Sequence, residues 1–279
     1  VFQSLALFPH MSVGQNIEFP LKLRKEATSA RRARALELLD LLRLPRDYYD
    51  KRISQCSGGE RQRVALARAL AFDPEILFFD EPLSALDYRL RKTLEKELKD
   101  LHARTGKTFV YITHSLEEAM VMSDRIAIMK DGRFEQIAVA DEIYGKPGSR
   151  FVAEFMGEVN LFAVNADSNG ALSSDVLSIK SGVKLDAVPP GGHGLLMVRP
   201  EYVRFAKEGA EQNADLDFTV SGLLHGEYAL GSRIQYEIET SAGMITVEKL
   251  REDRLTAREG DTVAIGFNAS VTHFIGDAA

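Results

Sequence analysis

The chain has 279 residues, 45% of them hydrophobic and 27% charged, which is typical of a globular protein long enough for two domains. A formal net charge of −6 argues against a surface that binds nucleic acid, and the single cysteine, Cys56, excludes an internal disulfide. No apolar run reaches the roughly 18 residues of a membrane-spanning helix, so any role at a membrane is expected to go through a partner.

The first part of the chain predicts three helices. Ser12 is placed to cap the first, and the leucines in 36–42 give the second an apolar face. Ser57 and Glu60 form the S-x-x-E pattern of a capping box, which predicts a third helix that starts at the two glycines between them. This helix is expected to end before the Asp-Pro pair at 73–74.

Two buried parallel strands are predicted next. The apolar run 76–79 ends in Asp80 and Glu81, and the β-rich run 109–113 ends at His114. Leucines at helical spacing over 90–101 predict a helix between them, which gives the strand, helix, strand order of a βαβ unit. A second capping-box pattern, Ser115 with Glu118, follows directly.

The pattern changes at Gly157. Before it come a strand over 125–129 and an amphipathic stretch over 141–155. After it come short alternating runs separated by turn residues, at 195–199, 233–238, 244–250 and 262–267. We therefore expect two domains, an α/β domain over 1–156 and a small all-β barrel or sandwich over 157–279.

Ser57, Gly58 and Gly59 are candidates for binding phosphate. Free backbone N–H groups at the positive end of a helix attract an anion, and glycines leave room for it to approach. Taken alone, the same triplet is more often an ordinary capped turn.

Asp80, Glu81 and His114 are candidates for nucleotide chemistry. The carboxyl ends of parallel strands are where ligands bind in open α/β folds. One carboxylate there can hold Mg²⁺ and the other can orient or deprotonate an attacking water, while the imidazole at the neighbouring strand end can reach the same edge.

These motifs occur along the chain in the order Gln3, Ser57–Glu60, Phe78–Pro82, Ser84–Asp87, Thr113–His114. In that order they resemble the ATP-binding subunit of ABC transporters, over roughly residues 1–156. The resemblance implies a P-loop NTPase-like α/β fold in which two copies enclose two ATP molecules.

The resemblance also implies a role for each candidate, with ATP and Mg²⁺ as cofactors. Gln3 is similar to the glutamine that senses the γ-phosphate and the metal, and Asp80 to the aspartate that supports Mg²⁺. Glu81 is similar to the general base, and His114 to the histidine that places the γ-phosphate. The other nucleotide-binding candidates are Asp87 and the signature that faces the ATP of the second copy: Ser57, Gly58, Gly59 and Glu60.

Three features depart from the family pattern. Cys56 and Glu60 stand where the signature most often has leucine and glutamine, and Cys56 is expected to be an inert packing residue. No G-x-x-x-x-G-K-[ST] phosphate loop occurs, and the chain opens on Val1. We expect a chain truncated before Gln3 whose own ATP hydrolysis is weak or absent.

The second domain resembles, through Val198-Arg199-Pro200-Glu201, the OB-like TOBE domain of importers of polyamines, iron, sugars and oxyanions. Among these, Gly157–Asn160 favours the polyamine branch. The implied partners are a second copy, transmembrane permease subunits and, indirectly, an extracytoplasmic solute-binding protein. The implied location is peripheral, at the cytoplasmic face of the inner membrane.

Two other functions stay open. A non-hydrolytic module that binds a ligand or partner through 157–279 is suggested by the missing phosphate loop. A chromosome or repair ATPase shares the Ser-Gly-Gly and Asp-Glu motifs. Such a protein needs long coiled-coil arms between its half-sites, and only about 20 residues separate the neighbourhood of Gln3 from the end of the first helical stretch.

Overall fold

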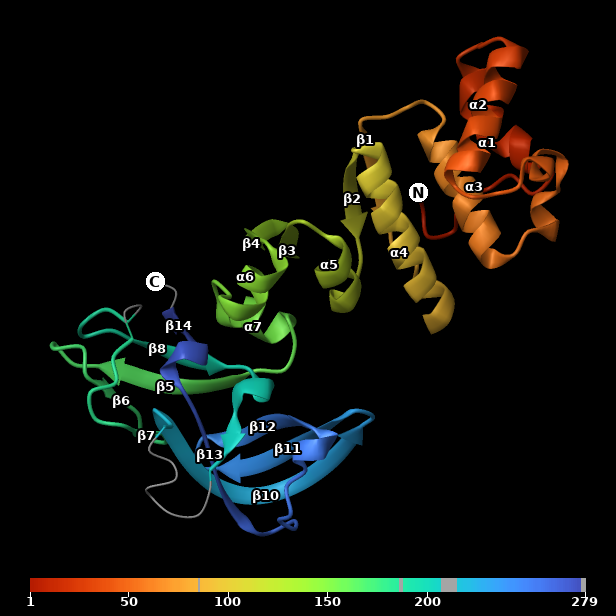
Figure 1. Ribbon diagram of the computed structural model, residues 1–279. Coiled ribbons are helices and arrows are strands. Elements are labelled where there is room, and N and C mark those ends of the chain that lie inside the picture. The colour runs from red at the N-terminus through yellow and green to blue at the C-terminus, as the bar shows by residue number, and fades with distance from the viewer. Residues whose placement is uncertain (85, 186–187, 207–214, 277–279) are drawn as a thin grey trace. The chain divides into compact units, whose positions relative to one another are not determined.

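The computed structural model describes residues 1–84, 86–185, 188–206 and 215–276 (Figure 1). Ala85, in the predicted Ser84–Asp87 motif, lies outside them. The chain divides into two compact units, Val1–Ser123 and Asp124–Ala279. Residues 124–156, which we expected to belong to the first domain, group in this division with the strands that follow them.

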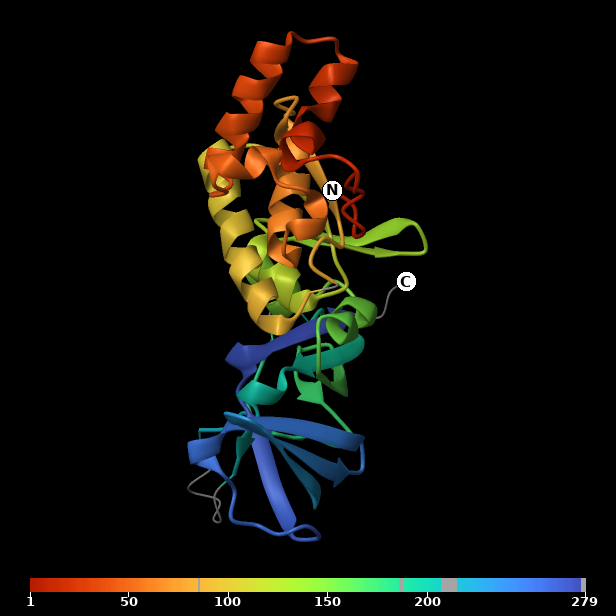
Figure 2. The ribbon, with the colours of Figure 1, turned by 90° about the vertical axis from the view of Figure 1, so that its right-hand side faces the viewer.

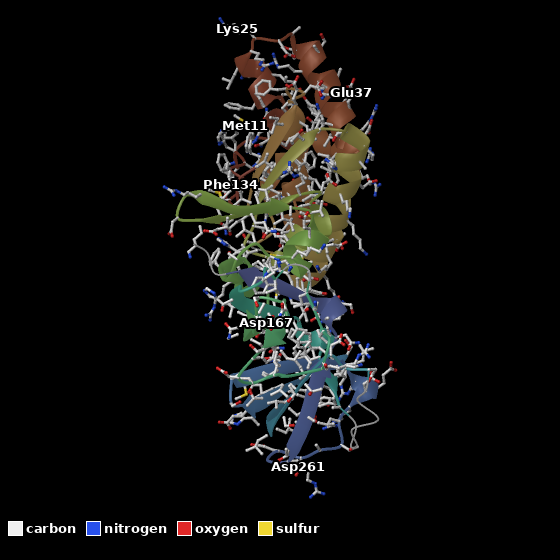
Figure 3. All side chains as sticks on the ribbon, turned by 90° about the vertical axis from the view of Figure 1, so that its left-hand side faces the viewer. Met11, Lys25, Glu37, Phe134, Asp167 and Asp261 are labelled. Carbon is white, nitrogen blue, oxygen red and sulfur yellow. The ribbon has the colours of Figure 1, made fainter. Side chains whose placement is uncertain are left out.

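The three predicted helices of the first unit are confirmed. They are α1 (Val13–Leu23), α2 (Thr28–Leu41) and α3 (Gly58–Leu70), with two short 3₁₀ turns, η1 (Arg46–Asp50) and η2 (Ile53–Gln55), between the last two. Ser12 caps α1, and the loop between α1 and α2 carries Lys25, at the end of this unit far from β1 and β2 (Figure 3). The apolar faces of α1, α2 and α3 meet in one core, so the three helices pack together as one group.

The predicted βαβ unit consists of β1 (Ile76–Asp80), α4 (Tyr88–Thr105) and β2 (Thr108–Ile112), followed by α5 (Leu116–Met122). β1 and β2 are parallel, and α4 lies beside them (Figure 1). Leu77 and Phe79 share a buried cluster with leucines of α4. The prediction that both strands are fully buried is wrong. Ile76 and Phe78 are 47% and 63% exposed, because side chains alternate along a strand and α4 packs on one face only.

The second unit begins with a hairpin, β3 (Ile126–Lys130) and β4 (Arg133–Ala138). Asp131 and Gly132 between them have φ values of 49° and 77°, as a two-residue type I′ turn requires. Phe134 on β4 is 61% exposed (Figure 3). The predicted amphipathic stretch that follows forms two short helices, α6 (Ala140–Gly145) and α7 (Arg150–Phe155).

Two antiparallel sheets make up the rest of the second unit (Figure 2). The four-stranded sheet contains β5 (Asn160–Ala166), β6 (Leu172–Ser173), β8 (His193–Val198) and β14 (Thr272–Gly276). The six-stranded sheet contains β7 (Ser178–Ile179), β9 (Arg204–Phe205), β10 (Phe218–Leu230), β11 (Arg233–Thr240), β12 (Gly243–Leu250) and β13 (Thr262–Phe267). Apolar side chains from both sheets form one core, as the predicted β domain requires.

Arg199 joins this core to the two short helices. It is only 1% exposed, and its guanidinium donates five hydrogen bonds of 2.9–3.2 Å to the carbonyls of Tyr144, Ala153, Gly157 and Glu158. The guanidinium carbon lies 4.2 Å from the centre of the Tyr144 ring, and burial lowers the pKa of Arg199. The last carbonyls of short helices have no partner within the helix, so one buried side chain satisfies groups at the ends of both.

Candidate active site

Three contacts join Gln3 to His114, through Ser84 and Glu81, at the carboxyl ends of β1 and β2. The Gln3 amide donates to Ser84 Oγ at 3.0 Å, and Ser84 Oγ donates to the Glu81 carbonyl at 2.9 Å. His114 Nε2 lies 2.7 Å from Glu81 Oε1. Three predicted catalytic residues therefore meet at one edge, and Ser84, to which we had assigned no role, connects them.

The backbone of Glu81 is held in an unusual conformation. Its φ is 43°, in the left-handed region, and its N–H donates to the Ile112 carbonyl at 3.0 Å. Strained non-glycine backbone of this kind is enriched at functional sites. The Glu81 side chain is 25% exposed and that of His114 is 87% exposed, so packing leaves the histidine ring largely unconstrained.

Gln3 is held beside β1 by two sets of contacts. The Asp80 N–H donates to the Val1 carbonyl at 2.9 Å, which places the segment before Gln3 alongside the strand. The Arg68 guanidinium on α3 donates to the carbonyls of Leu5 and Ala6 at 2.8 and 2.7 Å, and both residues have positive φ. No motif pointed to Arg68, because its acceptors are backbone groups more than sixty residues away.

Asp80 and Gln3 suit Mg²⁺ in the chemistry of their donor atoms. Asp80 is exposed at the end of β1, and the amide of Gln3 that bonds Ser84 leaves its carbonyl oxygen available. Mg²⁺ takes oxygen ligands and is usually held by one or two protein groups together with phosphates and waters. The described ranges contain no cluster of three or more His, Cys, Asp or Glu side chains that could hold a metal ion.

Ser57 and Glu60 form the predicted capping box at the start of α3. Ser57 Oγ accepts from the Glu60 N–H at 3.3 Å, and Glu60 Oε2 accepts from the Ser57 N–H at 2.8 Å. Tyr48 and Lys51 also donate to the Glu60 carboxylate, at 2.9 and 3.0 Å. The backbone bond from Ser57, then the bond from Lys51, lower the pKa of Glu60 to about 2.

Gly58 and Gly59 supply the free backbone donors of this turn, because the first N–H groups of a helix have no acceptor within it. A Cβ on Gly59 would lie 3.2 Å from Leu90 Cδ1 on α4, so this position favours glycine. The Leu90 N–H in turn donates to Asp87 Oδ1 at 3.0 Å, which makes Asp87 the cap of α4. The signature and Asp87 therefore form a second group, and no hydrogen bond or ion pair within the described ranges joins it to Glu81 or His114.

Cys56 was expected to be an inert packing residue, and its burial agrees with that; Arg63 makes a contact between two helices. Cys56 is 4% exposed, and burial raises the pKa of its thiol, which keeps it in the unreactive form. Arg63 makes two hydrogen bonds of 2.6 and 2.9 Å with Glu97, which tie α3 to α4.

Comparison with known proteins identifies the class. Residues 1–84 match the family model of ABC transporters, and residues 196–275 match that of the TOBE domain. The chain belongs to the ATP-binding proteins of ABC transporters, with an α/β ATPase domain followed by an all-β TOBE domain. Among the helices that the structure describes, none has both the length and the apolar character to cross a bilayer.

Within this class the chain is related to spermidine/putrescine import ATP-binding proteins named PotA. It is 39% identical to the one from Mesorhizobium japonicum, over 95% of this chain and 72% of the relative. It is 38% identical to those from Ruegeria pomeroyi and Chromobacterium violaceum, over 99% of this chain and 75% and 78% of the relatives. A solved dimeric ABC transporter cassette is 37% identical over 50% of this chain and 61% of that chain, with a TM-score of 0.43.

Proposed function

We propose that this chain is the ATP-hydrolysing, energy-coupling subunit of an importer for polyamines such as spermidine and putrescine. The observation that carries the hydrolytic part is the contact between His114 and Glu81 at the carboxyl ends of two parallel strands. The names of relatives that align over nearly the whole chain support the polyamine part.

In this proposal Glu81 is the general base and His114 its partner. Glu81 Oε1 is held against His114, which leaves Oε2 to accept a proton from an attacking water. Asp80 and Gln3 would hold Mg²⁺, which when bound would supply positive charge beside the ATP phosphates. Gln3 would report on the bound metal and nucleotide through Ser84, because its amide donates to Ser84 Oγ, which in turn donates to the Glu81 carbonyl.

The second group of candidates serves a second copy of the chain. Gly58 and Gly59 offer free backbone donors beside the Ser57 hydroxyl. Among the described residues no hydrogen bond or ion pair joins this turn to Glu81, and a homodimer would present it to the ATP of the partner. Conformational changes of the ATPase dimer would be transmitted to permease subunits in the membrane. A solute-binding protein would deliver the polyamine to these subunits on the extracytoplasmic side. The chain itself would work peripherally at the cytoplasmic face of the inner membrane.

The test uses the protein expressed from the complete gene. Glu81→Gln is expected to lower kcat for ATP hydrolysis about 100-fold, the usual size of a general-base contribution. Glu75→Gln, an exposed carboxylate just before β1, is the matched control and should keep full turnover. Turnover close to wild type in Glu81→Gln would refute the base assignment.

The polyamine part needs a separate measurement. Cells that lack their own polyamine importer and carry this protein with its permease and solute-binding partners should accumulate radiolabelled spermidine or putrescine. Intact ATPase activity without uptake of either would overturn the substrate and leave the hydrolytic role in place.

A further inference from the structure

Glu118 on α5 is a buried carboxylate for which the proposed mechanism has no use. Its side chain is only 4% exposed, and Glu118 Oε2 accepts hydrogen bonds from the Tyr111 hydroxyl at 2.9 Å and from Thr113 Oγ1 at 2.8 Å. The predicted reciprocal capping box is wrong here. Ser115 Oγ accepts from the Glu118 N–H at 3.2 Å, but the Glu118 carboxylate turns inward to β2 instead of returning to the Ser115 N–H.

These bonds hold the two residues that flank His114. Thr113 Oγ1 donates to Glu118 and accepts from the Ser115 N–H at 3.0 Å, and Ser115 is itself bonded to the Glu118 backbone. The His114 ring is 87% exposed, so the backbone on either side decides where it lies. Burial and the Glu118 charge raise the pKa of Tyr111, which keeps its phenol protonated as a donor to that carboxylate.

Arg91 on α4 connects Glu118 to the loop after Glu81. Its Nη2 donates to the Leu86 carbonyl at 3.1 Å, and its Nε lies 3.8 Å from Glu118 Oε1. The Arg91 Nε is buried and has no hydrogen-bond partner. Its distance from Glu118 Oε1 allows electrostatic attraction but is too long for a hydrogen bond. A small shift of loop or helix would close the gap.

We propose that Glu118 is a positioning residue that holds His114 within reach of Glu81, and that Arg91 ties its position to the loop carrying Ser84, Leu86 and Asp87. The inference rests on the proposed roles of His114 and Glu81. Within one chain, displacement of the loop that carries Asp87, next to the signature, would then move Arg91 and Glu118 and so change the position of His114.

A double-mutant cycle in the gene-encoded protein tests the route. Glu118→Gln is expected to lower kcat for ATP hydrolysis about 10- to 100-fold with KM for ATP within about twofold, as for loss of an orienting partner. Combined with His114→Ala it should cost no more than His114→Ala alone, because both changes remove the same interaction. Independent, multiplicative losses would overturn the proposal.

Two further variants keep the test clear of misfolding. Glu117→Gln is the matched control, since this neighbour on the same helix is 63% exposed and pairs with Lys92, and it should leave kcat unchanged. Thr113→Val keeps the side-chain shape, removes the hydroxyl bonded to Glu118, and should reproduce the Glu118→Gln loss. If Glu118→Gln lowers the unfolding temperature, Thr113→Val decides the outcome.

An NMR measurement without ATP separates this proposal from the proposed function. The ring Cε1–Hε1 signal of His114, assigned by its loss in His114→Asn, should shift or broaden in Glu118→Gln and not in Glu117→Gln. An unchanged signal would overturn the positioning role. Wild-type turnover in His114→Ala would instead refute the catalytic assignment of the histidine, whatever the NMR result.

Discussion

Replacing Arg199 with methionine should destabilise the second unit strongly. Methionine replaces the aliphatic part of the arginine side chain and donates no hydrogen bond, so the carbonyls of Tyr144, Ala153, Gly157 and Glu158 lose five bonds at once. An unpaired buried carbonyl costs about 1–3 kcal/mol. If water reaches two of the four, the remaining two account for a loss of about 4 kcal/mol in the free energy of unfolding.

Urea unfolding followed by far-UV circular dichroism measures this loss. With a slope of about 2 kcal/mol/M, the midpoint of the transition of the second unit should fall by about 2 M. Hydrogen exchange should accelerate first at the amides of residues 144–158. Arg204→Met is the matched control, because Arg204 is 62% exposed and lies 3.9 Å from Asp215, and it should change stability by less than about 0.5 kcal/mol. A loss below about 1 kcal/mol in Arg199→Met would refute the reasoning.

Two further predictions concern the first unit. Glu60 has a pKa lowered from 4.5 to about 2, so its contribution is present above pH 4.5 and lost as the pH falls toward 2. The shift corresponds to about 3 kcal/mol, and solvent screening at its 24% exposed side chain reduces this to about 1–2 kcal/mol. Urea unfolding at several pH values should therefore show Glu60→Gln less stable than wild type at neutral pH and the gap closing below pH 4.5; a constant gap would contradict this. Gly14→Ala should cost about 1–3 kcal/mol, because the new Cβ would overlap the Tyr49 ring. A midpoint of the first unit equal to that of the wild type would show that the Tyr49 ring moves aside without cost.

The helices and strands with strong local signals could be predicted from the sequence. Ser12 and Ser57 cap α1 and α3 as expected, and Gly106 ends α4 with a φ of 61°. The strands β5 and β14 were not predicted, because they pair with β8 far along the chain. The strand β10 was also missed, although a two-residue turn joins it to β11. The exposure of one face of β1 could not be predicted either, because an apolar run does not show whether one or both faces of the strand are covered.

The candidate site could be predicted as residue types at strand ends but not as a network. Glu81 and His114 follow their strands in the sequence, and parallel pairing brings them to one edge. Ser84 and Arg68 join the site through bonds to Gln3 and to the backbone after it, over separations of 81 and about 60 residues. No spacing rule covers such contacts, because they arise from packing of whole elements.

Glu60 and Glu118 show why the same pattern has two outcomes. Both stand three residues after a serine that caps a helix, and both backbone N–H groups donate to that serine. Beside Glu60 the nearest donors, Lys51 and Tyr48, precede the helix on the same side as the Ser57 N–H, so the carboxylate returns and closes the box. Beside Glu118 the donors are the hydroxyls of Tyr111 on β2 and of Thr113 just after it. A buried carboxylate is stabilised by such donors, so this one turns to the strand. Neighbours outside the motif decide the direction of each side chain. The local pattern therefore predicted both helix starts correctly, but it predicted the position of the carboxylate correctly only for Glu60.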